Sequence, residues 1–190
     1  SGELTVLVLA VTLAVAALTG VGFFTDRIAQ AVELQAAEVI AADLRLESPN
    51  PVSDGVVAEA RNRGLATARV TTLVSVVFAG EQNQLTALRA VTAGYPLRGK
   101  LRIADRPFGP GRAVDGIPRP GEGWADSRLI SRLGVKVGDE LSVGSAHIRV
   151  THVLEYRPDQ GSSFVDLATT LLINADDLPG TALIAPGSRV

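Results

Sequence analysis

The hydrophobic pattern opens with an unbroken apolar run from Leu4 to Phe24, 21 residues without a charge or a proline. At about 1.5 Å per residue, a helix of that length spans roughly 31 Å, close to the thickness of the hydrocarbon layer of a bilayer. A signal peptide has a shorter apolar segment after a basic one, whereas acidic Glu3 precedes this run. A core helix of a soluble protein is rarely apolar on every side. The run therefore predicts a transmembrane helix over 1–25, with a signal peptide and a buried core helix as the alternatives.

The same run carries small and hydroxylated residues at regular spacings. Three threonines recur every seven residues, and small residues occur four apart, a spacing that lets membrane helices approach closely. The alternative is that such residues are simply common in membrane helices. We predict a face that packs against other membrane helices, formed by Thr5, Thr12, Thr19, Ala16 and Gly20.

No glycine or proline interrupts the chain between Thr25 and Ala42, and apolar residues there follow helical spacing. The pattern predicts one continuous helix of about 39 residues, roughly 58 Å long, whose second half continues beyond the membrane as a stalk. An amphipathic helix lying on the bilayer is the alternative. The stalk's apolar positions are Ile28, Val32, Ala36, Val39 and Ile40.

The next stretch predicts the first half of an α/β unit. Alternation over 43–47 is typical of a strand, 54–63 of a short helix, and 70–79 with 84–93 of a long hairpin. The order strand, helix, strand, strand is half of a split α/β sandwich. We therefore expect its second helix and last strand beyond Val190, so that one face of the sheet is poorly covered here.

The segment 106–123 holds five glycines and four prolines, a composition that predicts no regular structure. Further along, the pattern predicts a short helix through Leu133, two short strands within 134–144, a strand over 146–156, a strand over 169–174, and a turn or short helix at 175–178.

Composition narrows the chemistry. The formal charge is −2 and no basic patch is present, which argues against nucleic-acid binding. The absence of cysteine excludes a disulfide, a thiolate zinc site and a catalytic thiol. The phosphate-binding pattern GxxxxGK[ST] does not occur, which argues against nucleotide binding.

Candidate catalytic residues do not form a constellation, so we predict no catalytic, cofactor or metal site. His147 and His152 fall five apart on one expected strand, and a regular strand points them to opposite faces. Ser162, Ser163 and Asp166 lie near a loop without a GxSxG motif or a neighbouring histidine.

An acidic pair and the single tryptophan are better explained by structural roles than by catalysis or binding. Asp176 and Asp177 are more typical of a helix start than of an acid/base pair. Trp124, beside the Gly-rich segment, is expected to pack over its own module, with a role as an exposed anchor for a partner as the alternative.

Several stretches resemble one family of membrane proteins, the FtsX-like, MacB-type ABC transporter permeases, and among them the YbbP-like permeases. The resemblance to their first membrane helix rests on SGELTVLVLAVTLAVAALTGVGFFTDRI. The resemblance to their extracytoplasmic domain rests on AADLRLES, AVTAGYPLRGKLRI and WADSRLISRLGVKVGDELSVG. It implies a Porter-like α/β subdomain with an inserted Sabre-like β-module, further membrane helices, and a cytoplasmic ABC ATPase subunit of the YbbA-like type.

We therefore expect an α+β fold behind one membrane helix. The expected division is a transmembrane helix at 1–25, a helical stalk at 26–42, the first half of the Porter-like subdomain at 43–104, the β-rich module with its Gly/Pro-rich connector at 105–165, and a truncated return to the α/β subdomain at 166–190.

The resemblance implies a non-catalytic permease fragment in the inner (plasma) membrane, with the residues after about 26 on the extracytoplasmic side. Hydrolysis of ATP by the partner subunit would then be coupled to movement of a hydrophobic or lipid-like substrate. Two alternatives remain, a single-span sensor or binding module and a signal-anchored periplasmic enzyme.

Overall fold

The computed structural model describes residues 2–39, 41–160 and 167–184. The chain divides into two compact units, Ser1–Ala37 and Glu38–Val190.

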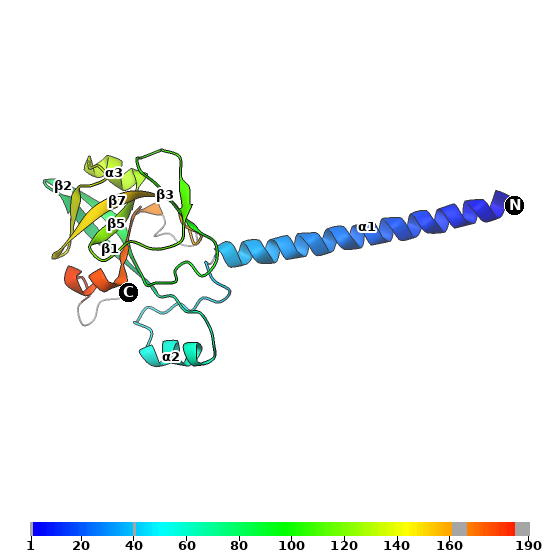
Figure 1. The fold of residues 1–190 in the computed structure, drawn as a ribbon, viewed down its shortest axis with the longest axis horizontal. Coiled ribbons are helices and arrows are strands. Elements are labelled where there is room, and N and C mark those ends of the chain that lie inside the picture. The colour runs from blue at the N-terminus through cyan, green and yellow to red at the C-terminus, as the bar shows by residue number, and fades with distance from the viewer. Residues whose placement is uncertain (1, 40, 161–166, 185–190) are drawn as a thin grey trace. The chain divides into compact units, whose positions relative to one another are not determined.

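The first unit lies within one long helix, α1, which runs without interruption from Gly2 to Val39 (Figure 1). Of this helix, Gly2–Ile28 is long and apolar enough to cross a membrane, with a mean hydropathy of 2.5. The continuous helix expected from the absence of glycine and proline between Thr25 and Ala42 is thus confirmed as far as Val39.

The second unit begins with a segment in which one expectation is wrong. Residues 43–47 are irregular rather than a strand. Leu44 and Leu46 are 84% and 65% exposed, so the alternation does not mark a buried face. No described strand pairs with this segment, and an isolated extended segment has no ladder to hold it. The expected helix that follows is confirmed as α2 (Asp54–Asn62). Arg69, the residue just before the first strand, donates to Asp54 Oδ1 at the start of this helix at 2.9 Å.

The long hairpin is confirmed as β1 (Val70–Ala79) and β2 (Gln82–Val91). Its turn is tighter than expected, because Ala79 already pairs with Gln82. Gly80 has φ +59°, a left-handed conformation that glycine adopts without the strain a side chain would bring.

The described strands form a single mixed sheet in the order β4-β3-β7-β5-β8-β2-β1-β6, and β6 also pairs with β7. The strands from β7 through β5, β8, β2, β1 and β6 therefore close into a small barrel, with β3 and β4 extending from β7 as a flap. The pairings β2–β8 and β5–β7 are parallel and the others antiparallel. The remaining bounds are β3 Leu101–Ala104, β4 Arg112–Val114, β5 Glu122–Asp126, β6 Glu140–Val143, β7 Ala146–Tyr156 and β8 Thr169–Asn174.

Two local expectations in this region are wrong. The Gly/Pro-rich segment 106–123 contains β4 and the start of β5, because their partners β3, β7 and β8 supply hydrogen bonds that local composition does not reveal. Residues 135–139 form a turn rather than the first of two strands. Lys136 N donates to Asp139 Oδ2 at 2.8 Å, and Asp139 N donates back to Lys136 O at 3.1 Å.

The short helix α3 (Ser127–Leu133) is present as expected. Asp126 Oδ1 accepts from Leu129 N at 2.7 Å at its start, and Gly134 ends it with φ +64°. The strands expected in a separate module, β6 and β7, share the sheet with the hairpin and β8. The division into subdomain and module stays a prediction.

Two cores lie on opposite faces of this sheet. The barrel core fills the interior, where alternate residues such as Val77, Leu88 and Leu171 are fully buried and α3 adds Leu129. Gly123 is required there, because a Cβ would lie 2.7 Å from Ile148 Cγ2. The outer core packs on the other face and comprises Ala41, Val91, Tyr95, Leu101, Ile103, Trp124, Leu154 and Leu172.

The outer face of the hairpin is less well covered than the rest of the sheet. Val74, Val76, Phe78 and Leu85 are each between 38% and 54% exposed. This exposure agrees with the expected poorly covered face, while the expectation that the covering elements lie beyond Val190 stays a prediction.

Candidate functional site

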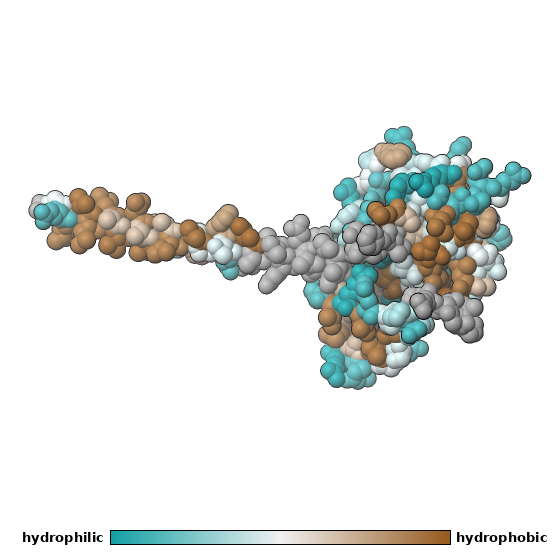
Figure 2. Space-filling view, turned by 180° about the vertical axis from the view of Figure 1, so that it is seen from behind, coloured by the Kyte–Doolittle hydropathy of each residue, from teal (hydrophilic) through white to brown (hydrophobic). Residues whose placement is uncertain are grey.

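The apolar part of α1 is the first feature with a functional meaning. Its large side chains from Leu4 to Phe24 are exposed along the helix, and Figure 2 shows this stretch as an almost continuous apolar surface. A fully exposed apolar helix is unstable in water but suits a bilayer, where the surrounding acyl chains are equally apolar.

The predicted packing face of this helix combines threonines that bond within the helix with exposed small residues. Thr12 Oγ1 donates to Val8 O at 2.8 Å, and Thr19 Oγ1 donates to Val15 O at 2.7 Å, so these hydroxyls are satisfied within their own helix. Gly20 has no atom within 4 Å of where a Cβ would stand, which leaves its backbone open to a neighbour. Thr5 and Ala16 are exposed. Packing against another helix through this face stays a prediction.

The predicted stalk residues lie largely at the limit of what the structure describes. Ile28 is 47% exposed on α1. Val32, Ala36 and Val39 lie within α1, but their side chains are outside the described part. Ile40 lies outside the described residues.

The domain holds the chain firmly just after α1 ends. Ala41 is 5% exposed in the outer core, and its carbonyl accepts from Arg98 N at 3.0 Å. Asp43 receives two bonds of 2.8 Å from the same arginine's side chain, which lower the pKa of Asp43. Only Ile40 therefore separates the last helical residue from a residue anchored in a core.

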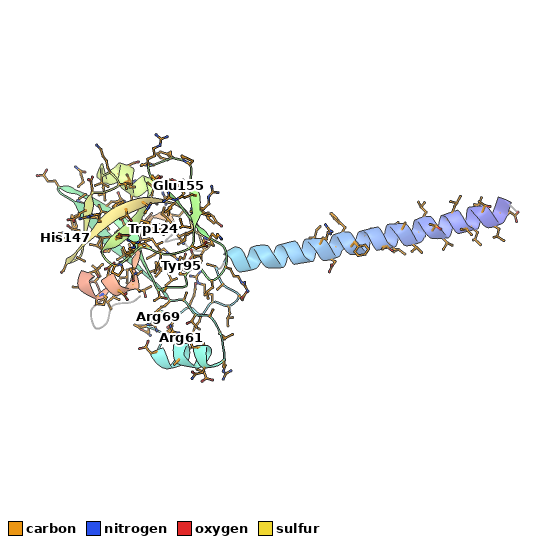
Figure 3. All side chains as sticks on the ribbon, viewed as in Figure 1. Arg61, Arg69, Tyr95, Trp124, His147 and Glu155 are labelled. Atoms are coloured by element: carbon orange, nitrogen blue, oxygen red, sulfur yellow. The ribbon has the colours of Figure 1, made fainter. Side chains whose placement is uncertain are left out.

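A buried charged cluster lies at the edge of the outer core. Asp159 accepts from Arg89 Nη2 through Oδ2, from Arg157 Nη1 at 2.8 Å and from Tyr95 Oη at 2.7 Å through Oδ1. All three charged side chains are at most 4% exposed. The cluster joins β2, the segment between β2 and β3 that contains Tyr95, and the segment after β7, so its bonds connect parts of the chain that are distant in sequence. Tyr95 is labelled in Figure 3.

Sequence reasoning missed this cluster. The signal that could have found it is Arg89, a cation in the middle of the apolar pattern QLTALRAV on a strand expected to be half buried. A buried arginine requires a carboxylate partner, but the partner is 70 positions away and no local pattern identifies it.

Burial and the neighbouring Asp159 carboxylate raise the pKa of the Tyr95 hydroxyl above its ordinary value of 10.0. The unfolded chain therefore loses this proton first as the pH rises, and stability that is fully present below pH 10 declines above it.

We expect Tyr95→Phe to cost about 1.5–3 kcal/mol of unfolding free energy at pH 7, because it removes a buried hydrogen bond to a charged group. The difference in unfolding free energy between wild type and Tyr95→Phe should decrease above pH 10. Denaturation followed by the fluorescence of Trp124 measures both free energies. If this difference in unfolding free energy stays constant with pH, the Tyr95 hydroxyl does not cause the loss of stability above pH 10.

The remaining candidate residues that the structure describes do not form a catalytic group. The pairing of β5 with β7 shifts register between Gly123 and Trp124, so His152 pairs with Trp124 on the outer face. His147 pairs with Ser142. The residues on either side of Ser142, Leu141 and Val143, point into the barrel core, so Ser142 and His147 lie on the outer face as well. The expectation that the histidines point to opposite faces is thus wrong because of the bulge. They still do not meet, since five strand residues span about 16 Å.

Within the described residues, no group of three or more His, Asp or Glu side chains could hold a metal ion. Trp124 is 6% exposed in the outer core, which confirms its packing interpretation. Asp176 and Asp177 lie in a 3-10 turn, η2 (Ala175–Asp177), and Asn174 Oδ1 accepts from Asp176 N at 3.0 Å. Ser162, Ser163 and Asp166 lie outside the described residues.

A shallow groove of about 650 Å³ lies beside β3, β4 and β7. The charged side chains that line the groove already have hydrogen-bond or ion-pair partners. Lys100 Nζ lies 3.2 Å from an Asp115 carboxylate oxygen, Arg102 donates to Gly111 O at 3.2 Å, and Glu155 contacts Ser127 Oγ at 3.3 Å. Among its lining residues, the groove brings together no nucleophile and base.

No protein-family model matches the chain. Two solved structures are similar to it in part, and each similarity covers 70% of this chain. The extracellular domain of the noncanonic ABC-type transporter YknZ from Gram-positive bacteria aligns over 66% of its own length, with a TM-score of 0.49 and 13% identity. The periplasmic region of MacB from Actinobacillus actinomycetemcomitans aligns over 60% of its length, with a TM-score of 0.43 and 14% identity.

One curated relative is similar over the whole length of this chain. It is the uncharacterized ABC transporter permease YbbP of Escherichia coli (strain K12), which is 33% identical over all 190 residues of this chain. The chain spans 23% of that relative's length. The similarity to ABC transporter permeases expected from the motifs is confirmed, in a chain that consists of an N-terminal apolar helix and an α/β domain with a mixed sheet.

Proposed function

We propose that this chain is the part of an ABC transporter permease that carries motion from the membrane to an extracytoplasmic domain. A separate ATPase subunit, of the YbbA-like type, hydrolyses ATP in the cytoplasm, and the permease moves a hydrophobic or lipid-like substrate outside the inner membrane. The chain itself supplies no hydrolytic chemistry in this scheme. The similarity of this whole chain to part of a permease supports the assignment.

The continuity of α1 is the observation that carries this proposal. The helix is apolar enough to span a membrane as far as Ile28 and then continues for 11 more residues to Val39. Those 11 residues add about 16 Å of helix beyond the apolar part. No glycine or proline lies between Thr25 and Val39, so this part of the helix resists bending and can transmit a displacement, whereas a flexible linker absorbs it.

The connection at the end of the helix supports the same mechanism. Buried Ala41 and the bonds between Asp43 and Arg98 fix the chain to the domain immediately after Val39. In our proposal, residues 26–42 act as a stalk, and Thr5, Thr12, Thr19, Ala16 and Gly20 face further membrane helices of the same permease.

The experiment inserts Gly-Gly-Ser-Gly-Gly after Gln30 in the complete permease, with its ATPase partner present. We expect substrate movement to fall strongly while ATP hydrolysis largely persists, because the insert breaks the helix between span and domain. The domain should keep its fold, since its own contacts begin at Ala41. Transport and ATPase activity are measured in the same reconstituted vesicles.

The matched control inserts seven helix-forming residues at the same position. This insert keeps the helix and its facing while lengthening it by only about 10 Å, so transport should be better preserved. If the glycine insert transports as well as wild type, motion does not pass through the helix. The outer domain is then a passive binding module.

A further inference from the structure

Two routes lead from the end of α1 to the sheet of the domain. One follows the chain through residues 44–69 to the start of β1 at Val70. The other crosses directly from the residues after α1 to the loop between β2 and β3, residues 92–100, which we call the coupling loop. A displacement of α1 reaches the sheet through the stiffer of these two routes, since a flexible segment absorbs it.

The route along the chain is loosely held. Residues 44–51 are all exposed and form neither helix nor strand. The helix that follows, α2, lies apart from the sheet in Figure 1, and none of its residues, all of which the structure describes, is buried. A segment without buried side chains has few contacts that hold it at a fixed distance from the rest of a domain. Residues 44–51 therefore form a flexible connection between α1 and β1.

The route through the coupling loop is short and held by polar bonds. Arg98 N donates to Ala41 O at 3.0 Å. The Arg98 guanidinium donates from Nε and Nη2 to the two carboxylate oxygens of Asp43, both at 2.8 Å. A two-point contact between a guanidinium and a carboxylate fixes the orientation of the two groups as well as their distance. A displacement of the chain just after α1 therefore also displaces the coupling loop.

The backbone of Ala41 shows that this part of the chain is not free to adjust. Its φ is +57°, a left-handed conformation that is unfavourable for a residue with a side chain and persists where the surroundings hold it. Here the outer core holds the buried side chain, and Arg98 N holds the carbonyl. The turn at Ala41 is thus imposed by contacts with the domain.

Tyr95 joins the coupling loop to the interior of the domain. This side chain is buried, and its hydroxyl donates to Asp159 Oδ1 at 2.7 Å. Asp159 also accepts from Arg89 on β2 and from Arg157 just after β7. The loop itself runs from β2 into β3. One loop therefore connects the chain after α1 with β2, β3 and the end of β7.

We propose that motion of α1 enters the domain through the coupling loop. Arg98 receives it from the chain after α1, and Tyr95 passes it to the buried cluster around Asp159. This inference rests on the proposed function, in which α1 carries motion from the membrane. It gives a role to the stretch GYPLRGK, residues 94–100. Arg98 and Tyr95 are positioning residues in this scheme, because they act through the contacts that they make within the domain.

Two insertions separate the routes. Each places Gly-Gly-Ser-Gly-Gly in the complete permease with its ATPase partner present, one after Gln30 and the other after Leu46. The first lies before the contacts with the coupling loop, and the second lies after them in the exposed segment 44–51. We expect substrate movement in reconstituted vesicles to fall severalfold with the insert after Gln30. It should stay close to wild type with the insert after Leu46, and ATP hydrolysis should persist in both.

A second set of variants tests the contact itself. Arg98→Ala removes both side-chain bonds to Asp43 and should lower transport severalfold, while the stability of the domain changes little because the pair is exposed. Reversing the pair, with Asp43→Arg and Arg98→Asp in one chain, should restore much of the lost transport. The matched control is Arg112→Ala, which removes a similarly exposed ion pair of 2.8 Å with Asp105. It should transport like wild type, because neither partner contacts the chain after α1 through this pair.

The outcomes distinguish this inference from the proposed function. If the insert after Gln30 leaves transport unchanged, the proposed function fails and this inference fails with it. If that insert stops transport and the insert after Leu46 stops it equally, motion follows the chain and not the coupling loop. Equal transport by Arg98→Ala and Arg112→Ala would overturn the role of Arg98. Denaturation followed by the fluorescence of buried Trp124 shows that each variant is folded.

Discussion

Replacing Asp159 with asparagine should cost the domain about 3–5 kcal/mol of unfolding free energy, the usual result of removing one charge from a buried ion pair. The Asp159 carboxylate contacts both Arg89 and Arg157, and all three side chains are almost fully excluded from water. Asparagine keeps the shape but not the charge, so two guanidinium groups lose a negative charge that offsets the cost of their burial. Denaturant unfolding of the full chain in detergent, followed by Trp124, measures the loss.

The matched control is Asp43→Asn, which removes one charge from an exposed pair. Asp43 and Arg98 form two bonds of 2.8 Å, a geometry as good as that of the buried cluster. Their side chains are 69% and 56% exposed, so water replaces the lost contact and the cost should be far smaller. Equal losses at Asp159 and Asp43 would mean that burial does not set the energetics of the cluster.

The parts of the fold that local patterns determine were predictable from the sequence. Uniform apolarity predicts α1, and β-branched alternation with a glycine turn predicts the β1–β2 hairpin. Asp126 and Gly134 mark the two ends of α3 through local hydrogen bonding and a left-handed backbone. In each case the information lies within a few residues of the element it defines.

The rest depends on partners that are distant along the chain. Residues 43–47 have the alternation of a strand and lack a neighbour to pair with, while β4 lies in a Gly/Pro-rich segment and has one. Barrel closure depends on β6 reaching both β1 and β7. The bulge that brings His152 beside Trp124 depends on the β5–β7 pairing. Local periodicity carries none of this information.

The candidate sites follow the same division. The membrane helix was predictable because its apolar run is continuous in sequence. The cluster around Asp159 was not, because its parts come from β2, Tyr95 and the segment after β7.

Two arginines placed in the span should remove the chain from the membrane. The dozen or so leucine, valine and phenylalanine side chains of the run each favour insertion by about 0.3–0.6 kcal/mol, roughly 4–7 kcal/mol together. Each arginine at the centre of a helix costs about 2.5–3.5 kcal/mol. The double variant Leu9→Arg, Leu13→Arg therefore cancels the driving force, and both charges lie on one face of α1 four residues apart.

The measurement is retention of the full chain in the membrane pellet after washing with alkaline carbonate. Wild type should stay in the pellet and the span variant should be released. The matched control, Leu44→Arg with Leu46→Arg, adds the same two charges in the irregular segment after α1, where both leucines are already exposed. It should remain in the pellet like wild type, because these positions lie outside the apolar run. Release of the wild-type chain by carbonate would show that α1 does not span the bilayer, and the stalk mechanism would lose its membrane end.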